Sequence, residues 1–141
     1  MIESQTFPFL EAKDNYGDVD LVPSLPLTLT YGQSSIAVSG LLDTGASVNV
    51  LPYSVGRDLG AIWEEQKFSV QLAGNLATVE AKGLVVSAQI GDFQPVTLVF
   101  AWSQTDDVPI LLGRMNFFLE FDVCFYRSRS LFDLRLKSSI V

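Results

Sequence analysis

Strict alternation of apolar and polar residues is the clearest pattern in the chain, and it begins at Leu25. Leu25, Leu27 and Leu29 alternate with smaller or polar residues up to Tyr31. A period of two residues is typical of a half-buried β-strand, because successive side chains point to opposite faces. Turn residues at 32–35 then lead into a second apolar segment at 36–42. The pattern therefore predicts two neighbouring strands joined by a short turn.

Further segments along the chain predict more strands and two short helices. The strands are expected at 48–51, 68–72, 77–90 with an interruption at Gly83, and 93–102. Helices are expected at 53–59, between Pro52 and Gly60, and at 114–120. Residues 121–126 and 131–136 are expected to form a terminal hairpin. Short spacings and turn residues favour an all-β domain with antiparallel pairing.

The first 24 residues differ from the rest of the chain. They are acidic, interrupted by Pro8, Gly17 and Pro23, and show no sustained period. We interpret 1–24 as an acidic arm or loosely packed lead-in, and 25–141 as one domain that includes the terminal hairpin. The N-terminus lacks the pattern of a signal peptide, and no segment reaches 18 uninterrupted apolar residues. We therefore expect a cytoplasmic protein that does not bind membranes.

Composition excludes several classes of chemistry. The chain has no histidine, which removes Ser-His-Asp and Cys-His catalysis and His-ligated metals. Its one cysteine, Cys124, lies in an apolar segment and is expected to be a small buried residue. Nine basic against 16 acidic residues give a net charge of −7, which disfavours nucleic acid as a partner. We expect no metal and no cofactor. The carboxylate pairs at 64–65 and 106–107 are interpreted as solvated loop charges.

One segment combines buried strands with a polar turn. Leu41 and Leu42 precede Asp43-Thr44-Gly45, and Val48 begins the next apolar stretch. A carboxylate between a buried strand and a tight glycine turn is a candidate for chemistry. An ordinary strand-ending turn has the same composition. The tripeptide alone should occur by chance in about one chain of this length in thirty.

A second motif strengthens the functional interpretation. Residues 108–114 read Val-Pro-Ile-Leu-Leu-Gly-Arg and precede an apolar helix. With both motifs in this order, residues 25–125 resemble the retropepsin-like aspartic proteases, which carry one Asp-Thr-Gly-Ala segment and one late Ile-Leu-Gly-Arg segment. The resemblance implies a closed antiparallel β-barrel with one or two short helices, active as a twofold homodimer. The implied activity is hydrolysis of extended polypeptides between two carboxylates that share a proton.

The resemblance also assigns roles to residues. It implies that Asp43 is the catalytic carboxylate, that Thr44 bonds across the dimer axis, and that Gly45 permits close approach of the loop and of substrate. Residues that contact substrate would be Ala46 and Ser47, and Leu72, Ala73, Gly74 and Asn75 at the tip of a flap formed by 68–79. Gly113 and Arg114 would support the dimer loop. An ordinary hairpin is the alternative for 68–79.

Departures from the family pattern affect pH dependence and activity. Ala46 stands where pepsin-like enzymes often have a hydroxyl, so we predict activity at mildly acidic pH. Ser47 replaces an acid common in viral members, while Arg114 is retained. A catalytically weak or inactive dimerisation or peptide-binding module of the same fold is therefore the alternative function. Residues 6–9, Thr-Phe-Pro-Phe, resemble junctions that retroviral proteases cleave, which suggests self-processing. A glycosidase is disfavoured because no second acid has a comparable context.

Overall fold

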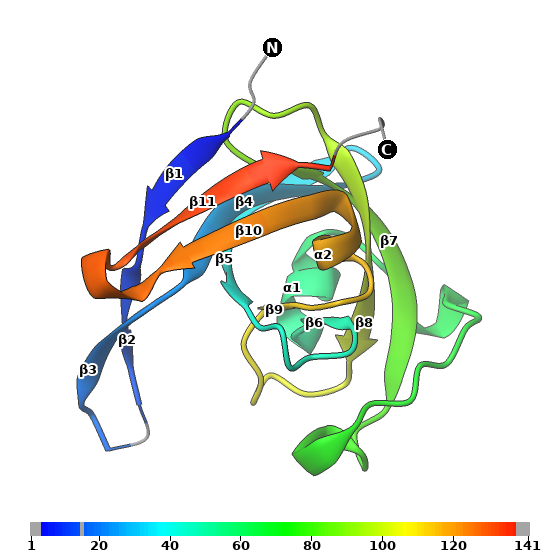
Figure 1. Ribbon diagram of the computed structural model, residues 1–141. Helices are drawn as coiled ribbons and strands as arrows, with labels where there is room; N and C mark the ends of the chain where they lie inside the picture. Colours follow the sequence, from blue (N-terminus) through cyan, green and yellow to red (C-terminus); the bar gives the residue numbers. More distant parts are fainter. Residues whose placement is uncertain (1–3, 15, 138–141) are drawn as a thin grey trace.

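A closed six-stranded barrel forms the main body of the protein (Figure 1). The computed structural model describes residues 4–14 and 16–137. The strands follow one another around the barrel in the order β4-β5-β9-β6-β8-β7, and β7 pairs back with β4. Their bounds are β4 (Ser24–Tyr31), β5 (Ser34–Leu42), β6 (Asn49–Leu51), β7 (Ala81–Gln89), β8 (Val96–Ser103) and β9 (Leu111–Leu112).

Alternating side chains fill the barrel. Leu25, Leu27 and Leu29 of β4 are at most 4% exposed, as their spacing predicts. One long ladder joins β7 and β8 in antiparallel register, with Leu84 opposite Phe100, and both of these side chains point into the core. The all-β prediction is thus confirmed. The predicted interruption at Gly83 is absent, because β7 runs through this residue.

Two strand pairs depart from the expected antiparallel arrangement. β5 and β9 are parallel, and so are β6 and β8. Parallel neighbours need long connections. Here β6, β7 and β8 lie in sequence between β5 and β9, and α1 and β7 lie between β6 and β8. Turn residues reveal only the pairing of strands that follow each other in sequence. The β5–β9 pair, with Leu42 beside Leu112, is what brings residues 43 and 113 together.

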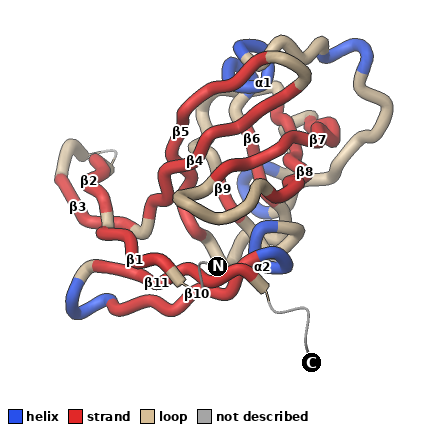
Figure 2. The backbone as a smooth tube through the Cα atoms, turned by 90° about the horizontal axis from the view of Figure 1, so that it is seen from above, coloured by secondary structure: helices blue, strands red, loops and turns tan. Residues whose placement is uncertain are grey.

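A three-stranded sheet covers one side of the barrel. Its order is β1-β11-β10, formed by β1 (Gln5–Pro8), β10 (Phe121–Tyr126) and β11 (Leu131–Leu136), with the 3₁₀ turn η3 (Arg127–Arg129) between the last two. Figure 2 shows this sheet as a layer beside the barrel. Phe132 and Leu134 are fully buried between them. The expected terminal hairpin is confirmed to the residue.

The N-terminal segment is more ordered than expected. β1 pairs with β11, so the interpretation of a loosely packed lead-in is wrong for residues 5–8. Phe7 stacks on Phe132 with ring centroids 5.5 Å apart, and Phe9 is 7% exposed. These contacts join the two ends of the chain, which no local pattern reveals. The suggested cleavage site at 6–9 therefore lies within a paired strand and the core.

A hairpin projects from the junction between the sheet and the barrel. It consists of β2 (Leu10–Lys13) and β3 (Val19–Val22) and forms a separate two-stranded sheet. Both views show it extending away from the barrel (Figures 1 and 2). Arg127 of η3 lies 3.9 Å from the Asp20 carboxylate of β3. Most of its side chains are exposed.

The helices are short and close to their predicted positions. α1 (Tyr53–Asp58) confirms the first, and α2 (Phe117–Glu120) begins three residues later than predicted because residues 114–115 are engaged in backbone pairing. A 3₁₀ turn, η1 (Trp63–Glu65), follows α1 and places Trp63 in the core with Trp102. None of the described helices has the length and hydrophobicity of a membrane-spanning segment.

Two further local expectations are wrong. Residues 68–72 form no strand, because only Ser69 makes a bridge, to Lys82, and 74–76 form the 3₁₀ turn η2 (Gly74–Leu76). Cys124 is exposed rather than buried, because it lies on the outer face of β10. There a hydrogen bond with the Cys124 thiol raises the pKa of the neighbouring Tyr126.

Candidate active site

The candidate site begins where β5 ends. Asp43 is the first residue beyond β5, and its N–H donates to the carbonyl oxygen of Leu112 at 3.0 Å. Its carboxylate oxygen Oδ1 accepts the N–H of Gly45 at 2.9 Å, while its carbonyl oxygen accepts the N–H of Ala46 at 3.1 Å. An aspartate two residues before a glycine favours such a turn, because the short side chain of the aspartate accepts the N–H of the residue two positions ahead. The turn fixes the carboxylate and leaves it partly exposed.

The second motif holds this loop from the other side. The N–H groups of Arg114 and Met115 donate to the carbonyl oxygens of Ala46 and Ser47, at 2.9 and 3.0 Å. The N–H of Asn49 returns a bond to the carbonyl oxygen of Met115 at 2.9 Å. The two motifs that sequence analysis singled out, 41–51 and 108–114, therefore lie side by side and are joined through their backbones.

Arg114 completes the loop with its side chain. Its guanidinium Nη1 donates to the carbonyl oxygen of Thr44 at 2.9 Å. The described residues hold no carboxylate within ion-pair distance of Arg114, which agrees with the presence of serine at position 47. Thr44, Gly45 and Ser47 are exposed. The tip of the loop therefore points to the surface while its two ends are tied down.

The structure brings together seven of the candidate residues: Asp43, Thr44, Gly45, Ala46, Ser47, Gly113 and Arg114. The four expected at the flap tip form a separate segment, and among the described residues no hydrogen bond joins them to the Asp43 loop. Ala73, Gly74 and Asn75 are exposed, whereas Leu72 is 4% exposed and packs in an apolar cluster with Val50.

Gly113 lies where the two motifs cross. A Cβ atom at this position would be 2.4 Å from the carbonyl oxygen of Val48 and 2.8 Å from that of Ala46. Any other residue would force the two segments apart, since backbone atoms cannot yield as a flexible side chain can. Glycine at position 113 is therefore a geometric requirement of the crossing.

Sequence analysis missed Asn49. Its side chain is 0% exposed, and its Oδ1 accepts the N–H of Gly113 at 2.8 Å. Its Nδ2 donates to the carbonyl oxygen of Val99 at 3.0 Å and to Asn116 Oδ1 at 3.1 Å. The available signal was an asparagine at an inward position between Val48 and Val50, where a polar side chain is uncommon unless it is fully bonded.

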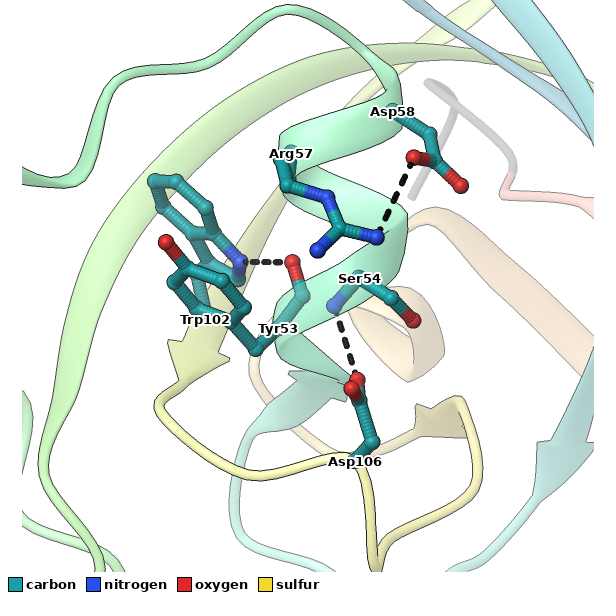
Figure 3. A network of polar contacts seen from close by, with 6 residues as sticks. All are labelled: Tyr53, Ser54, Arg57, Asp58, Trp102 and Asp106. Carbon is teal, nitrogen blue, oxygen red and sulfur yellow. Dashed lines mark hydrogen bonds and ion pairs between the residues drawn. The ribbon is translucent and has the colours of Figure 1, made fainter.

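A second polar network supports the opposite end of β8 (Figure 3). The Asp106 carboxylate accepts the N–H of Ser54 in the first turn of α1 at 2.8 Å. This hydrogen bond to the charged form lowers the pKa of Asp106 below its ordinary value. Trp102 Nε1 donates to the carbonyl oxygen of Tyr53, and the two rings stack with centroids 5.6 Å apart. The loop that leads into β9 is thereby fixed to α1.

Comparisons with known proteins agree with this geometry. The search of curated proteins finds no match. A solved structure, described as a retropepsin-like aspartic protease from Rickettsia conorii, superposes with a TM-score of 0.61 at 17% identity. The alignment covers 94% of this chain and 93% of that one. The fold is therefore retropepsin-like.

The family comparison covers both motifs. A family described as aspartyl protease matches residues 27–116, from β4 through the crossing of the two loops. The matched residues include Asp43 in its hydrogen-bonded turn, and Gly113 and Arg114 where the second motif crosses the Asp43 loop. The chain belongs to the aspartyl protease family.

Proposed function

We propose that this chain is one subunit of a homodimeric aspartic endopeptidase. The observation that supports it best is the Asp43 turn, in which a partly exposed carboxylate stands on a loop that is bonded at both ends to the second motif. Such preorganisation is what a catalytic carboxylate needs, because displacement by an ångström is costly to rate. The proposed substrate is an extended polypeptide segment.

The reaction uses two carboxylates and one water. The ionised carboxylate accepts a proton from the water, whose oxygen attacks the peptide carbonyl carbon. The protonated carboxyl group donates its proton to the carbonyl oxygen, which yields a neutral tetrahedral diol. Proton transfer to the amide nitrogen and return of a hydroxyl proton to the carboxylate then break the carbon–nitrogen bond. The pair ends with one shared proton, as it began.

The second carboxylate is proposed to be Asp43 of the partner subunit. The sequence contains Asp-Thr-Gly once, so a twofold axis beside the loop supplies the motif twice. The exposure of Thr44, Gly45 and Ser47 suits this arrangement, because these residues are available to face a second copy. Thr44 is proposed to bond across the axis.

Substrate is proposed to lie between the Asp43 loop and residues 72–75. Backbone groups around Gly45 and Ser47 would pair with the substrate main chain, as an added strand pairs with a sheet edge. The segment at 72–75 would act as the flap. Because η2 replaces a paired hairpin tip, this segment would change conformation when substrate binds.

Digestion of casein between pH 3 and 7 tests the proposal. Wild type should cleave, Asp43→Asn should lose at least about a thousandfold in kcat/KM, and the control Asp92→Asn should keep wild-type activity. Light scattering should show a dimer, and pepstatin should inhibit. Cleavage by Asp43→Asn would refute the mechanism, and so would activity from a strictly monomeric protein.

The alternative is a peptide-binding module without turnover. The observation that favours it is Ser47, which stands where viral members commonly have an acid. A dimeric wild type that binds unfolded casein with the same affinity as Asp43→Asn, and that cleaves nothing, would support the module. Release of peptides by wild type alone would exclude it.

A further inference from the structure

Two amide side chains lie behind the Asp43 loop and connect it to the barrel wall. They belong to Asn49, at the start of β6, and Asn116, just before α2. Asn49 Nδ2 donates to Asn116 Oδ1 at 3.1 Å. Neither residue carries a role in the mechanism proposed above, yet both contact the segment that holds the loop.

Asn49 uses its full hydrogen-bonding capacity. Oδ1 accepts the N–H of Gly113 at 2.8 Å and that of Phe117 at 3.3 Å, and Nδ2 has its two acceptors, the Val99 carbonyl and Asn116 Oδ1. An asparagine side chain offers two donors and two acceptor sites, so none is unsatisfied. Because two N–H groups lie on one side and two oxygens on the other, the amide can have only one orientation. A buried network that is fully satisfied specifies one geometry.

Asn116 holds that orientation from β8. Its Oδ1 accepts the N–H of Val99 at 3.0 Å, and its Nδ2 donates to the carbonyl oxygen of Thr97 at 3.0 Å. A side-chain amide here takes the position that a neighbouring peptide group would take along a strand. β8 therefore fixes Asn116, and Asn116 in turn fixes the amide of Asn49.

The network reaches the catalytic turn through the peptide group between Leu112 and Gly113. Its N–H, on Gly113, donates to Asn49 Oδ1, and its carbonyl oxygen, on Leu112, accepts the N–H of Asp43. We propose that Asn49 is a positioning residue that sets the place of the Asp43 carboxylate, with Asn116 orienting its amide. This inference rests on the proposed proteolytic function, and it concerns kcat more than substrate binding.

The substitution Asn49→Asp removes the two N–H donors of Nδ2 and keeps the oxygen that accepts hydrogen bonds. Aspartate has the same shape and still accepts both N–H groups, but its second oxygen would face the Val99 carbonyl and Asn116 Oδ1. A protonated carboxyl can donate to one of them, whereas ionisation would bury a charge against two oxygens. None of the hydrogen-bond partners of the Asn49 side chain has a titratable side chain. The charged residues on the segment that contains Gly113 and Phe117, Arg114 and Glu120, bond to Thr44 and Lys137.

The expected effect depends on pH in a stated direction. The carboxyl group that Asn49→Asp introduces would be protonated near pH 4, where it still donates to one acceptor, and would ionise in the folded protein as pH rises above the ordinary aspartate range, which removes that donor and sets a charge against two oxygens. The ratio of kcat for Asn49→Asp to kcat for wild type should fall at least about tenfold between pH 4 and 6, with KM unchanged within about twofold. Asn116→Asp keeps both acceptor contacts and loses only the donor to Thr97, so its effect should be smaller.

The control is Gln89→Glu, which makes the same chemical change at an exposed position. Gln89 Nε2 also donates to two carbonyl oxygens, those of Gly91 and Phe93. Its kcat ratio to wild type should not change with pH. A ratio for Asn49→Asp that is equally flat, or a loss of activity that only follows the fraction of unfolded protein, would overturn the proposal.

Amide hydrogen exchange gives a readout independent of proteolysis. In Asn49→Asp, the N–H groups of Arg114 and Met115 should exchange faster relative to wild type as pH rises, while those of β4 keep their protection. Uniform acceleration would mean global destabilisation and would contradict a positioning role. If wild type cleaves nothing, the proposed function fails by itself, and the exchange pattern still decides whether Asn49 orders the loop.

Discussion

Gly113 and Val48 approach so closely that a single added carbon atom at Gly113 would lie 2.4 Å from the Val48 carbonyl oxygen. At this point the Asp43 loop and the second motif exchange backbone hydrogen bonds. The candidate site therefore depends on two crossing segments rather than on one loop. Gly113 allows the crossing, Arg114 binds the tip of the loop, and Asn49 fills the space behind it.

Replacement of Gly113 by alanine should damage the crossing. The new Cβ would contact backbone oxygens of Ala46 and Val48, which cannot move without loss of the pairing. We expect a loss of about 2 to 4 kcal/mol in the free energy of unfolding, measured by urea denaturation. Gly83→Ala is the matched control, because a Cβ there would meet no heavy atom closer than 3.9 Å. Equal stability of the two variants would contradict the close approach.

The pH profile of catalysis should respond to residue 46. Ala46 offers no hydroxyl to the neighbouring Asp43 carboxylate, although its N–H closes the turn. In Ala46→Ser, a hydroxyl that donates to the ionised carboxylate would favour the charged form of the pair. The acidic limb of the profile of kcat/KM should therefore move to lower pH. Ala46→Cys, a weaker donor of similar size, should move it less. An identical limb in Ala46→Ser and wild type would refute this explanation.

Stability at low pH should depend on Asp106. The hydrogen bond from the Ser54 N–H lowers the pKa of Asp106 in the folded protein. The ionised carboxylate therefore stabilises the fold at pH values above the unfolded-state pKa, and this stabilisation is lost as pH falls through the lower, folded-state pKa. The urea midpoint of Asp106→Ala should therefore lie below that of wild type at pH 6. The difference should narrow as pH falls below the ordinary value of 3.8. Asp107→Ala, at the adjacent exposed position, is the control. A difference that grows toward low pH would have the wrong sign.

Local patterns predicted much of this structure. The leucine alternation in β4, the terminal hairpin and both crossing motifs were all visible, because each is encoded within at most 16 neighbouring residues. The β5–β9 and β6–β8 pairs were not, since parallel pairing joins segments about 50 to 70 residues apart. Asn49 was missed for the same reason. Its importance comes from Gly113, Val99 and Asn116, which lie near it only in the folded barrel.

The N-terminal segment should prove to be part of the folded domain. Phe9 is buried beside Phe132, and its N–H donates to the carbonyl oxygen of Ser130 at 2.8 Å. Phe9→Ala should therefore lower the free energy of unfolding by about 3 to 5 kcal/mol, the usual cost of removing a buried aromatic ring. Phe68→Ala removes the same ring from a side chain that is 78% exposed, and it should change stability by less than about 0.5 kcal/mol. Equal effects of the two substitutions would mean that the segment contributes little to the fold. A large loss at Phe9 alone would also argue against self-cleavage at residues 6–9, since the cut would separate β1 from the sheet that depends on it.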